Sequence, residues 1–151
     1  MRGYTGRMNI RLARPPTAIS APRFAEDVAS WVRARFSVEL DYSVESLAKV
    51  DDLLELMRAQ RVPIDDRVGE TLWCLGCYVG EVFVRNAPEA EWTDREMLPP
   101  VVACGETRIN PIGKVVKRVT LGDRGDLATF YARFTSDRDV RSSADTTRGS
   151  S

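Results

Sequence analysis

The sequence predicts an α+β fold with a helical N-terminal half, a buried central helix, a small antiparallel sheet of two or three short strands, and two C-terminal helices. Three observations predict it. Apolar residues recur at helical spacing as far as residue 85, short β-rich runs separated by turn residues follow between residues 90 and 109, and helical spacing returns after residue 110. Because the strands are grouped and do not alternate with helices, parallel βαβ units are not expected.

Two helices are predicted before residue 63. Pro22 suits the first turn of the first helix, since its missing N–H would have no partner there. The apolar residues of this helix recur at helical spacing: Phe24, Val28, Trp31, Val32 and Phe36. Ser43 is expected to cap the second helix, with Glu45 near its positive end. The apolar stripe of the second helix consists of Leu47, Val50, Leu54 and Met57, and Pro63 ends the region.

A third, central helix is predicted over residues 67–85, capped by Asp65 or Asp66 and closed by Asn86 and Pro88. One face of it consists of Val68, Leu72, Leu75, Val79, Val82 and Phe83. The opposite face carries Trp73, Cys74, Cys77 and Val84 together with Glu70 and Glu81. A helix that is apolar nearly all round belongs inside a domain, so we expect partners on both of its sides.

Two glycines, Gly76 and Gly80, lie one helical turn apart in this central helix. Each destabilises a helix interior by roughly 1 kcal/mol relative to alanine, so a compensating contact is expected. We expect another backbone to approach closely, either from the second helix or from the sheet. The alternative is a ligand groove with these glycines as its floor.

The strands are predicted at residues 90–93, 101–104 and 107–109, with Gly105 at a turn. Asn110 followed by Pro111 is a strong helix start, because a capping side chain precedes a first-turn proline. Ile112, Val115, Val116 and Val119 supply the apolar face of that helix, and Gly122 and Gly125 end it. Asp126 is expected to open a last helix whose apolar residues are Leu127, Phe130, Tyr131 and Phe134.

The chain of 151 residues suits one domain. We expect this domain at residues 21–135, a flexible basic arm at 1–20 and a disordered polar tail at 136–151. The arm carries four arginines and no acidic residue. No apolar run approaches the roughly 18 residues that span a bilayer. A cytoplasmic location is therefore expected.

The composition argues against several classes of function. The chain has no histidine, which removes Ser-His-Asp and Cys-His nucleophiles and every His-containing metal site. Its three cysteines, Cys74, Cys77 and Cys104, lack a good fourth zinc ligand, and neither a metal nor another cofactor is expected. Nucleic acid is an unlikely partner, because the basic arm has only Tyr4 for stacking and residues 24–100 carry 16 acids against 8 bases.

Residues Trp73 to Cys77 form a WCxxC sequence that resembles the thioredoxin active-site motif. That chemistry needs the first cysteine at a helix N-terminus, where the backbone N–H groups stabilise the thiolate. Here Cys74 is expected about two turns inside a helix. A thiol-redox protein or other enzyme using Cys74, Cys77 and Glu81 is therefore an alternative, and two buried structural cysteines are the favoured interpretation.

The candidate ligand or partner site consists of Tyr78, Glu81, Arg85 and Trp92. Glu81 lies on a helix that should be mostly buried, so its carboxylate must be paired or hydrogen-bonded. Arg85 is four residues further on, in the favourable orientation for an ion pair, and Lys117 or Arg118 could also reach it. A pocket formed by Tyr78, Glu81 and Trp92 would indicate a small-ligand binder along the Gly76 and Gly80 side.

Several of these residues also form a wider pattern. The series runs from Ser43, Ser46 and Leu47 to Asp51 and Leu54, continues with Gly76, Tyr78, Gly80, Glu81 and Val82, and ends at Trp92. It resembles a family of small bacterial domains of unknown function, which share an SxxSLxxxDxxL helix, a GxYxGEV helix and a following Trp strand. The resemblance covers residues 40–134 and implies a shared fold without a catalytic residue. Together these observations favour a non-catalytic module that binds another protein.

Overall fold

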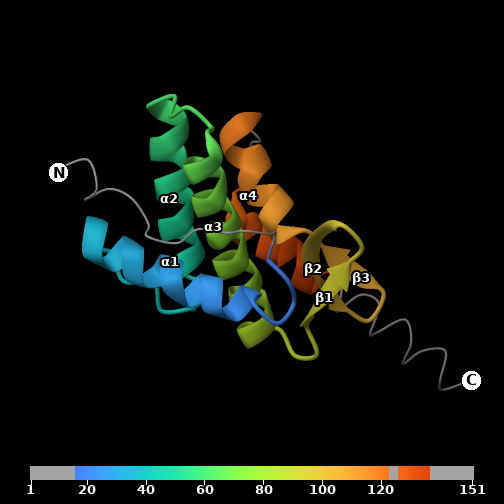
Figure 1. Ribbon diagram of the computed structural model, residues 1–151. Coiled ribbons are helices and arrows are strands. Elements are labelled where there is room, and N and C mark those ends of the chain that lie inside the picture. The colour runs from blue at the N-terminus through green and yellow to red at the C-terminus, as the bar shows by residue number, and fades with distance from the viewer. Residues whose placement is uncertain (1–15, 123–125, 137–151) are drawn as a thin grey trace, which may run out of the picture.

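The computed structural model describes residues 16–122 and 126–136. Four helices and a three-stranded sheet follow one another along the chain (Figure 1): α1 (Ala21–Phe36), α2 (Ser46–Ala59), α3 (Asp66–Asn86), β1 (Glu91–Arg95), β2 (Leu98–Cys104), β3 (Thr107–Ile109) and α4 (Pro111–Thr120). A further helical segment covers residues 127–136. This architecture confirms the predicted α+β fold. Most of the expected arm and tail, residues 1–15 and 137–151, lies outside the described residues.

Helix α3 is the buried centre of the molecule, as its sequence predicts. Every residue from Cys74 to Phe83 is buried. Helices α1 and α4 make the most extensive contacts with it, from different sides (Figure 1). The helix starts where Asp65 accepts a hydrogen bond from the Val68 N–H at 2.9 Å, which satisfies one of the unpaired N–H groups of the first turn.

The start of α2 differs slightly from the prediction. The helix begins at Ser46, and Ser43 lies in the turn before it. Ser43 still acts as a cap, because its hydroxyl accepts a hydrogen bond from the Ser46 N–H at 3.1 Å. The Asp41 carboxylate in turn accepts hydrogen bonds from the N–H and the hydroxyl of Ser43. Hydrogen bonds from these side chains to the nearby backbone thus hold the turn that precedes α2.

The sheet is antiparallel with the strand order β1-β2-β3. Trp92, Val102 and Ile109 are aligned across the three strands and pack against the core. Strand β2 begins at Leu98, three residues earlier than predicted. The added residues include Pro99 and Pro100, and proline normally argues against a strand because it cannot donate a hydrogen bond to the ladder. Strand β3 pairs only with the last three residues of β2, so the proline-containing half of β2 is bonded to β1 alone.

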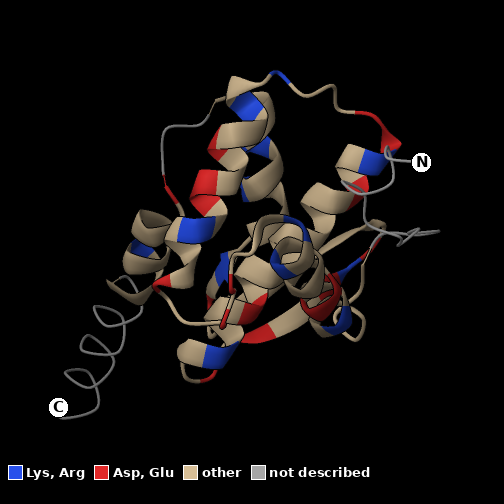
Figure 2. Cartoon of the chain, turned by 90° about the vertical axis from the view of Figure 1, so that its left-hand side faces the viewer, with Lys and Arg blue, Asp and Glu red and all other residues tan. Residues whose placement is uncertain are grey.

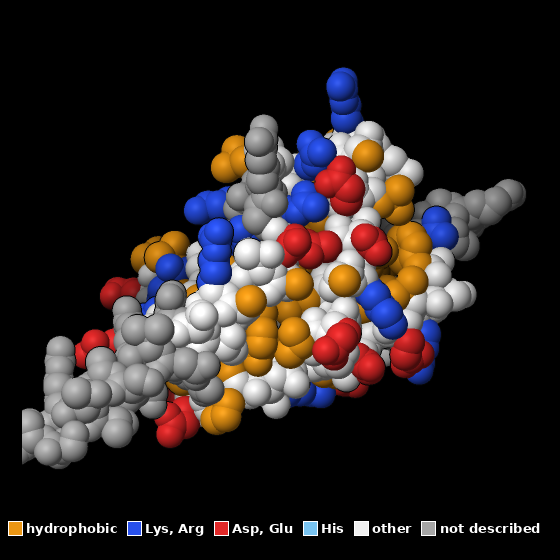
Figure 3. Space-filling model, turned by 180° about the vertical axis from the view of Figure 1, so that it is seen from behind, with side chains coloured by type: hydrophobic (Ala, Val, Ile, Leu, Met, Phe, Trp, Pro, Cys, Tyr) orange, Lys and Arg blue, Asp and Glu red, His pale blue; other side chains and the backbone are white. Residues whose placement is uncertain are grey.

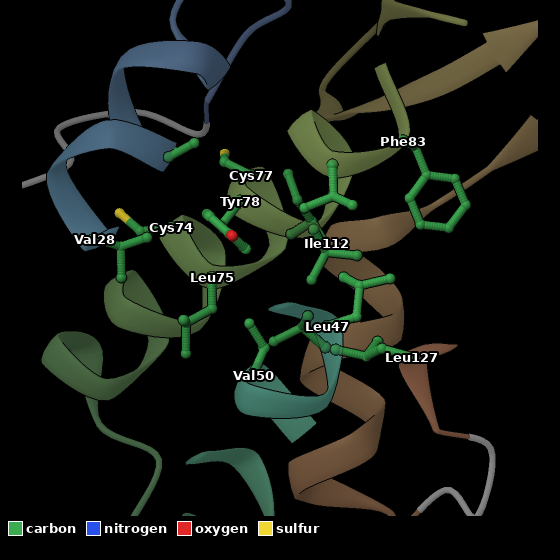
Figure 4. Packing of buried hydrophobic residues seen from close by; sticks show 14 of the residues in the cluster. Val28, Leu47, Val50, Cys74, Leu75, Cys77, Tyr78, Phe83, Ile112 and Leu127 are labelled. Atoms are coloured by element: carbon green, nitrogen blue, oxygen red, sulfur yellow. The ribbon is translucent and has the colours of Figure 1, made fainter. Parts of the chain in front are cut away.

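The core extends from α3 to the helices packed around it (Figure 4). It includes side chains of α1, α2 and α4, such as Val28, Leu47 and Ile112. At the C-terminal end of α3, the Phe83 ring lies about 5 Å from each of three rings of the last helical segment, those of Phe130, Tyr131 and Phe134. Among the described residues, no helix is both long enough and apolar enough to cross a membrane.

Candidate functional site

Glu81 supplies the carboxylate of the predicted site and is buried, with 4% of its surface exposed. Both of its oxygens accept hydrogen bonds. The indole N–H of Trp92 donates to Oε1 at 2.9 Å, and Nε of Arg85 donates to Oε2 at 3.0 Å. A buried carboxylate is stable only with such partners, so α3 and β1 are joined here by a satisfied ion pair and hydrogen bond.

Arg85 continues this contact towards the surface. Its guanidinium carbon lies 3.6 Å from the centre of the Tyr42 ring, and its NH2 group is 4.0 Å from Glu26 of α1. The Tyr42 hydroxyl donates to the same Glu26 carboxylate at 2.9 Å. The ion pair of Glu81 and Arg85 therefore reaches the loop between α1 and α2, and no sequence pattern points to Tyr42.

Tyr78 also contacts Tyr42. Its hydroxyl accepts a hydrogen bond from the Tyr42 N–H at 2.9 Å and shares another with the Ser46 hydroxyl at 2.6 Å. The two tyrosine rings are 4.8 Å apart. Burial raises the pKa of Tyr78 above its ordinary value, which opposes ionisation of the hydroxyl.

These contacts connect all four predicted site residues. We call the set the Glu81 network; its members are Glu26, Tyr42, Ser46, Tyr78, Glu81, Arg85 and Trp92. It ties α1, α2, α3 and β1 together at one end of the central helix. The polar atoms of Glu81 and Tyr78 are engaged by the protein itself, so the geometry supports a structural clamp more strongly than a ligand site.

The glycine side of α3 is filled by the protein's own atoms. A Cβ atom at Gly76 would lie 2.5 Å from the backbone of Ile112, and one at Gly80 would lie 2.2 Å from the Trp92 ring. At Gly80 the sheet contributes the side chain of Trp92 and not a backbone, so the expected close approach of another backbone is found only at Gly76. At Gly76 the neighbour is α4 and not α2, because the start of α4 crosses α3 at this point. The occupied glycine side leaves no room for the ligand groove.

The cysteines have the properties of core residues. Cys74 and Cys77 are both buried in the interior of α3, far from its N-terminus. Burial raises the pKa of Cys74 to about 12 and raises that of Cys77 as well. A redox cysteine needs an accessible thiolate, which these surroundings oppose. No cluster of three or more potential metal ligands occurs within residues 16–122 and 126–136.

A second polar cluster, which the sequence did not reveal, joins α2, α4 and the last helical segment. Asp51 accepts a hydrogen bond from the Leu127 N–H at 2.8 Å, and its other oxygen faces Nε of Arg118 at 3.7 Å. Arg118 also donates to Glu55 at 3.1 Å. Arg118 therefore pairs with Asp51 and Glu55, and the alternative that it pairs with Glu81 is not found. Burial raises the pKa of Asp51.

Basic and acidic residues are interspersed along the chain (Figure 2). Apolar side chains also reach the surface in small groups between charged ones (Figure 3). Two adjacent residues stand out, because Met97 is 92% exposed and Leu98 is 54% exposed. They lie where β1 turns into β2; we call Glu96, Met97 and Leu98 the hairpin tip. The other exposed large apolar residues are Ile19, Phe36, Leu56, Ile64 and Leu121.

No protein-family model matches the chain, and no curated protein gives a significant match. A crystal structure of a protein from Bacteroides thetaiotaomicron VPI-5482 has a similar fold, with a TM-score of 0.60 and 18% sequence identity. The likeness covers 82% of this chain and 44% of that chain, so this chain spans less than half the length of its structural neighbour. At this level of identity, the likeness shows a shared fold alone.

Proposed function

We propose that the chain is a non-catalytic protein-interaction module that contacts its partner through the hairpin tip. The observation that carries this proposal is the conformation of Met97. It is almost fully exposed and has a left-handed backbone with φ of 59°, a conformation that costs a methionine about 1 kcal/mol. Unfavourable conformations of this kind occur where the surrounding structure, and often a function, holds the backbone in place.

The fold supports the tip as a rigid element. Strand β1 is anchored to α3 by Trp92, and Nε of Arg95 donates to the Pro99 carbonyl at 2.9 Å across the base of the turn. The Ala18 N–H, before α1, donates to Asp94 at 2.7 Å. Met97 and Leu98 are therefore displayed from a braced hairpin, whose ordered backbone loses little entropy on binding.

The residues of the bacterial family pattern also support a role without catalysis. Ser46 binds Tyr78, Asp51 binds the backbone of Leu127, and Glu81 binds Trp92. Gly80 makes room for the Trp92 ring. Each has an internal structural task, so we propose that members of such a family share the clamp and differ in what their surfaces bind.

Site-specific photo-crosslinking tests the proposal. A photoreactive phenylalanine analogue would replace Met97 in one variant and the exposed Leu121 in a control variant, both in cells of the source organism. We expect a discrete protein adduct from position 97 and none from position 121, since only the tip contacts the partner. Equal adducts from both positions, or none from position 97 in a folded protein, would contradict the proposal.

A further inference from the structure

The segment that leads into the hairpin tip is acidic. Residues 89–98 contain four acids and one base, a net charge of −3. All four acids, Glu89, Glu91, Asp94 and Glu96, are exposed. The base, Arg95, is half-buried, and its Nε donates to the Pro99 carbonyl of the same hairpin. Asp94 also accepts the Ala18 N–H. The exposed charges of the strand that leads to the apolar tip are therefore negative.

This arrangement resembles the anatomy of a protein-binding surface, in which an apolar centre is surrounded by a charged rim. The apolar centre supplies most of the binding energy, whereas rim charges steer the encounter and select the partner. Methionine suits such a centre because its flexible thioether adapts to irregular apolar pockets. A partner that complements this surface needs an apolar pocket flanked by lysine or arginine.

Resting on the proposed function, we propose that the hairpin tip and its acidic flank, the exposed acids Glu89, Glu91, Asp94 and Glu96, bind a cationic amphipathic segment of a partner protein. The apolar side of that segment covers Met97 and Leu98, and its basic residues lie against Glu91 and Glu96. Acidic or neutral amphipathic segments are rejected, because like charges face each other or the acidic flank loses water without gaining a partner.

Three synthetic peptides with the same helical leucine spacing test this inference: one with lysine at the polar positions, one with glutamine and one with glutamate. Their binding to the full chain would be followed by fluorescence anisotropy. We expect the lysine peptide to bind more tightly than the glutamine and glutamate peptides by about tenfold or more. Its affinity should also fall with rising salt, because the rim charges are exposed and are screened.

Three double variants locate the site. Met97→Ser with Leu98→Ser should weaken binding of the lysine peptide by about tenfold. Glu91→Gln with Glu96→Gln should weaken it and flatten the salt dependence. The control, Leu56→Ser with Leu121→Ser, removes exposed apolar residues elsewhere and should leave binding unchanged.

The outcomes separate the two proposals. If the tip variant weakens binding but the glutamate or glutamine peptide binds as tightly as the lysine peptide, the cationic partner is overturned and the interaction tip is supported. If the tip variant, checked for folding by circular dichroism, binds the lysine peptide as well as the native chain does, this inference is overturned. Photo-crosslinking from position 97 then decides separately whether the tip is an interaction surface at all.

Discussion

At the scale of single residues, Glu81 shows how one buried charge can join distant parts of a chain. Its two oxygens accept hydrogen bonds from Trp92 and Arg85, which lie on different elements. Removing one partner of a buried pair costs more than the pair itself contributes, because the other group keeps its desolvation cost. Arg85 is 43% exposed, so water can replace part of what it would lose.

Replacing Glu81 by glutamine should lower the free energy of unfolding by about 1–3 kcal/mol. The new amide would point an N–H group at the N–H donors of Trp92 or Arg85. Urea denaturation would measure the change, and the matched control is Glu26→Gln, which alters an exposed carboxylate of the same network and should change stability by less than about 0.5 kcal/mol. Equal stability of Glu81→Gln and the native chain would show that the clamp does not depend on this charge.

The three thiols give a prediction about reactivity. Because Cys74, Cys77 and Cys104 are all buried and the pKa of Cys74 is raised to about 12, we expect alkylation near neutral pH to be slow in the native state and fast in denaturant. An exposed control thiol, introduced as Leu121→Cys, should react at once in the folded chain. Rapid native labelling of Cys74 or Cys77, detected by mass spectrometry, would reopen the thiol-redox alternative.

At the scale of elements, helix α3 needs glycine at some positions and only tolerates it at others. A Cβ atom at Gly80 would overlap the Trp92 ring, whereas one at Gly69 would meet nothing within 4 Å. Gly69→Ala should therefore stabilise the protein by roughly 0.5–1 kcal/mol through helix propensity. Gly80→Ala should destabilise it by about 1–3 kcal/mol, because Trp92 must move and its bond to Glu81 is strained. In thermal denaturation, the midpoint temperature should rise for Gly69→Ala and fall for Gly80→Ala. A rise in both variants would mean that the Trp92 ring can move aside at little energetic cost.

Asp51 links three elements and makes their packing sensitive to pH. Burial raises its pKa above the ordinary 3.8, so the fold favours its protonated form. Its contribution to stability is fully present below the unfolded pKa and is lost as pH rises through the folded pKa. We expect the free energy of unfolding of the native chain to fall relative to Asp51→Asn as pH rises from about 3.5 towards neutrality. Urea denaturation across this range measures the difference, and Asp52→Asn, at an exposed neighbour, is the control. A difference that is flat or rises with pH would contradict the burial of this carboxyl.

The elements that the sequence predicts best are those fixed by local chemistry. The caps at Asp65 and Asn110 are found as expected, since each needs only a side chain within three residues of its target. Tyr42 escaped prediction because its contacts depend on a loop with a left-handed backbone, where φ is 64°. The sequence also does not predict that Arg118 pairs with Asp51 instead of Glu81, because this depends on how α4 crosses α3.

At the scale of the whole molecule, the core is complete only when the last helical segment packs against α3. Phe83 belongs to the central helix, yet its three aromatic neighbours lie about fifty residues further along the chain. The segment is also bonded at its start, where Asp51 accepts the Leu127 N–H and Asp126 accepts the Thr129 N–H. These contacts make the packing at the C-terminal end of α3 depend on the C-terminal segment.

Phe134→Ala tests this closure. Phe134 is buried against Phe83, and deleting a buried phenylalanine ring costs about 3–5 kcal/mol through lost transfer energy and the cavity left behind. Arg133→Ala, at the exposed neighbouring position, should change stability by less than about 0.5 kcal/mol. Hydrogen exchange adds a spatial readout, because weaker closure should speed exchange in residues 127–136 and at the C-terminal end of α3 before it affects α1. If exchange rose equally in all helices, the segment would unfold only with the entire domain, and local release of the C-terminal segment would be ruled out.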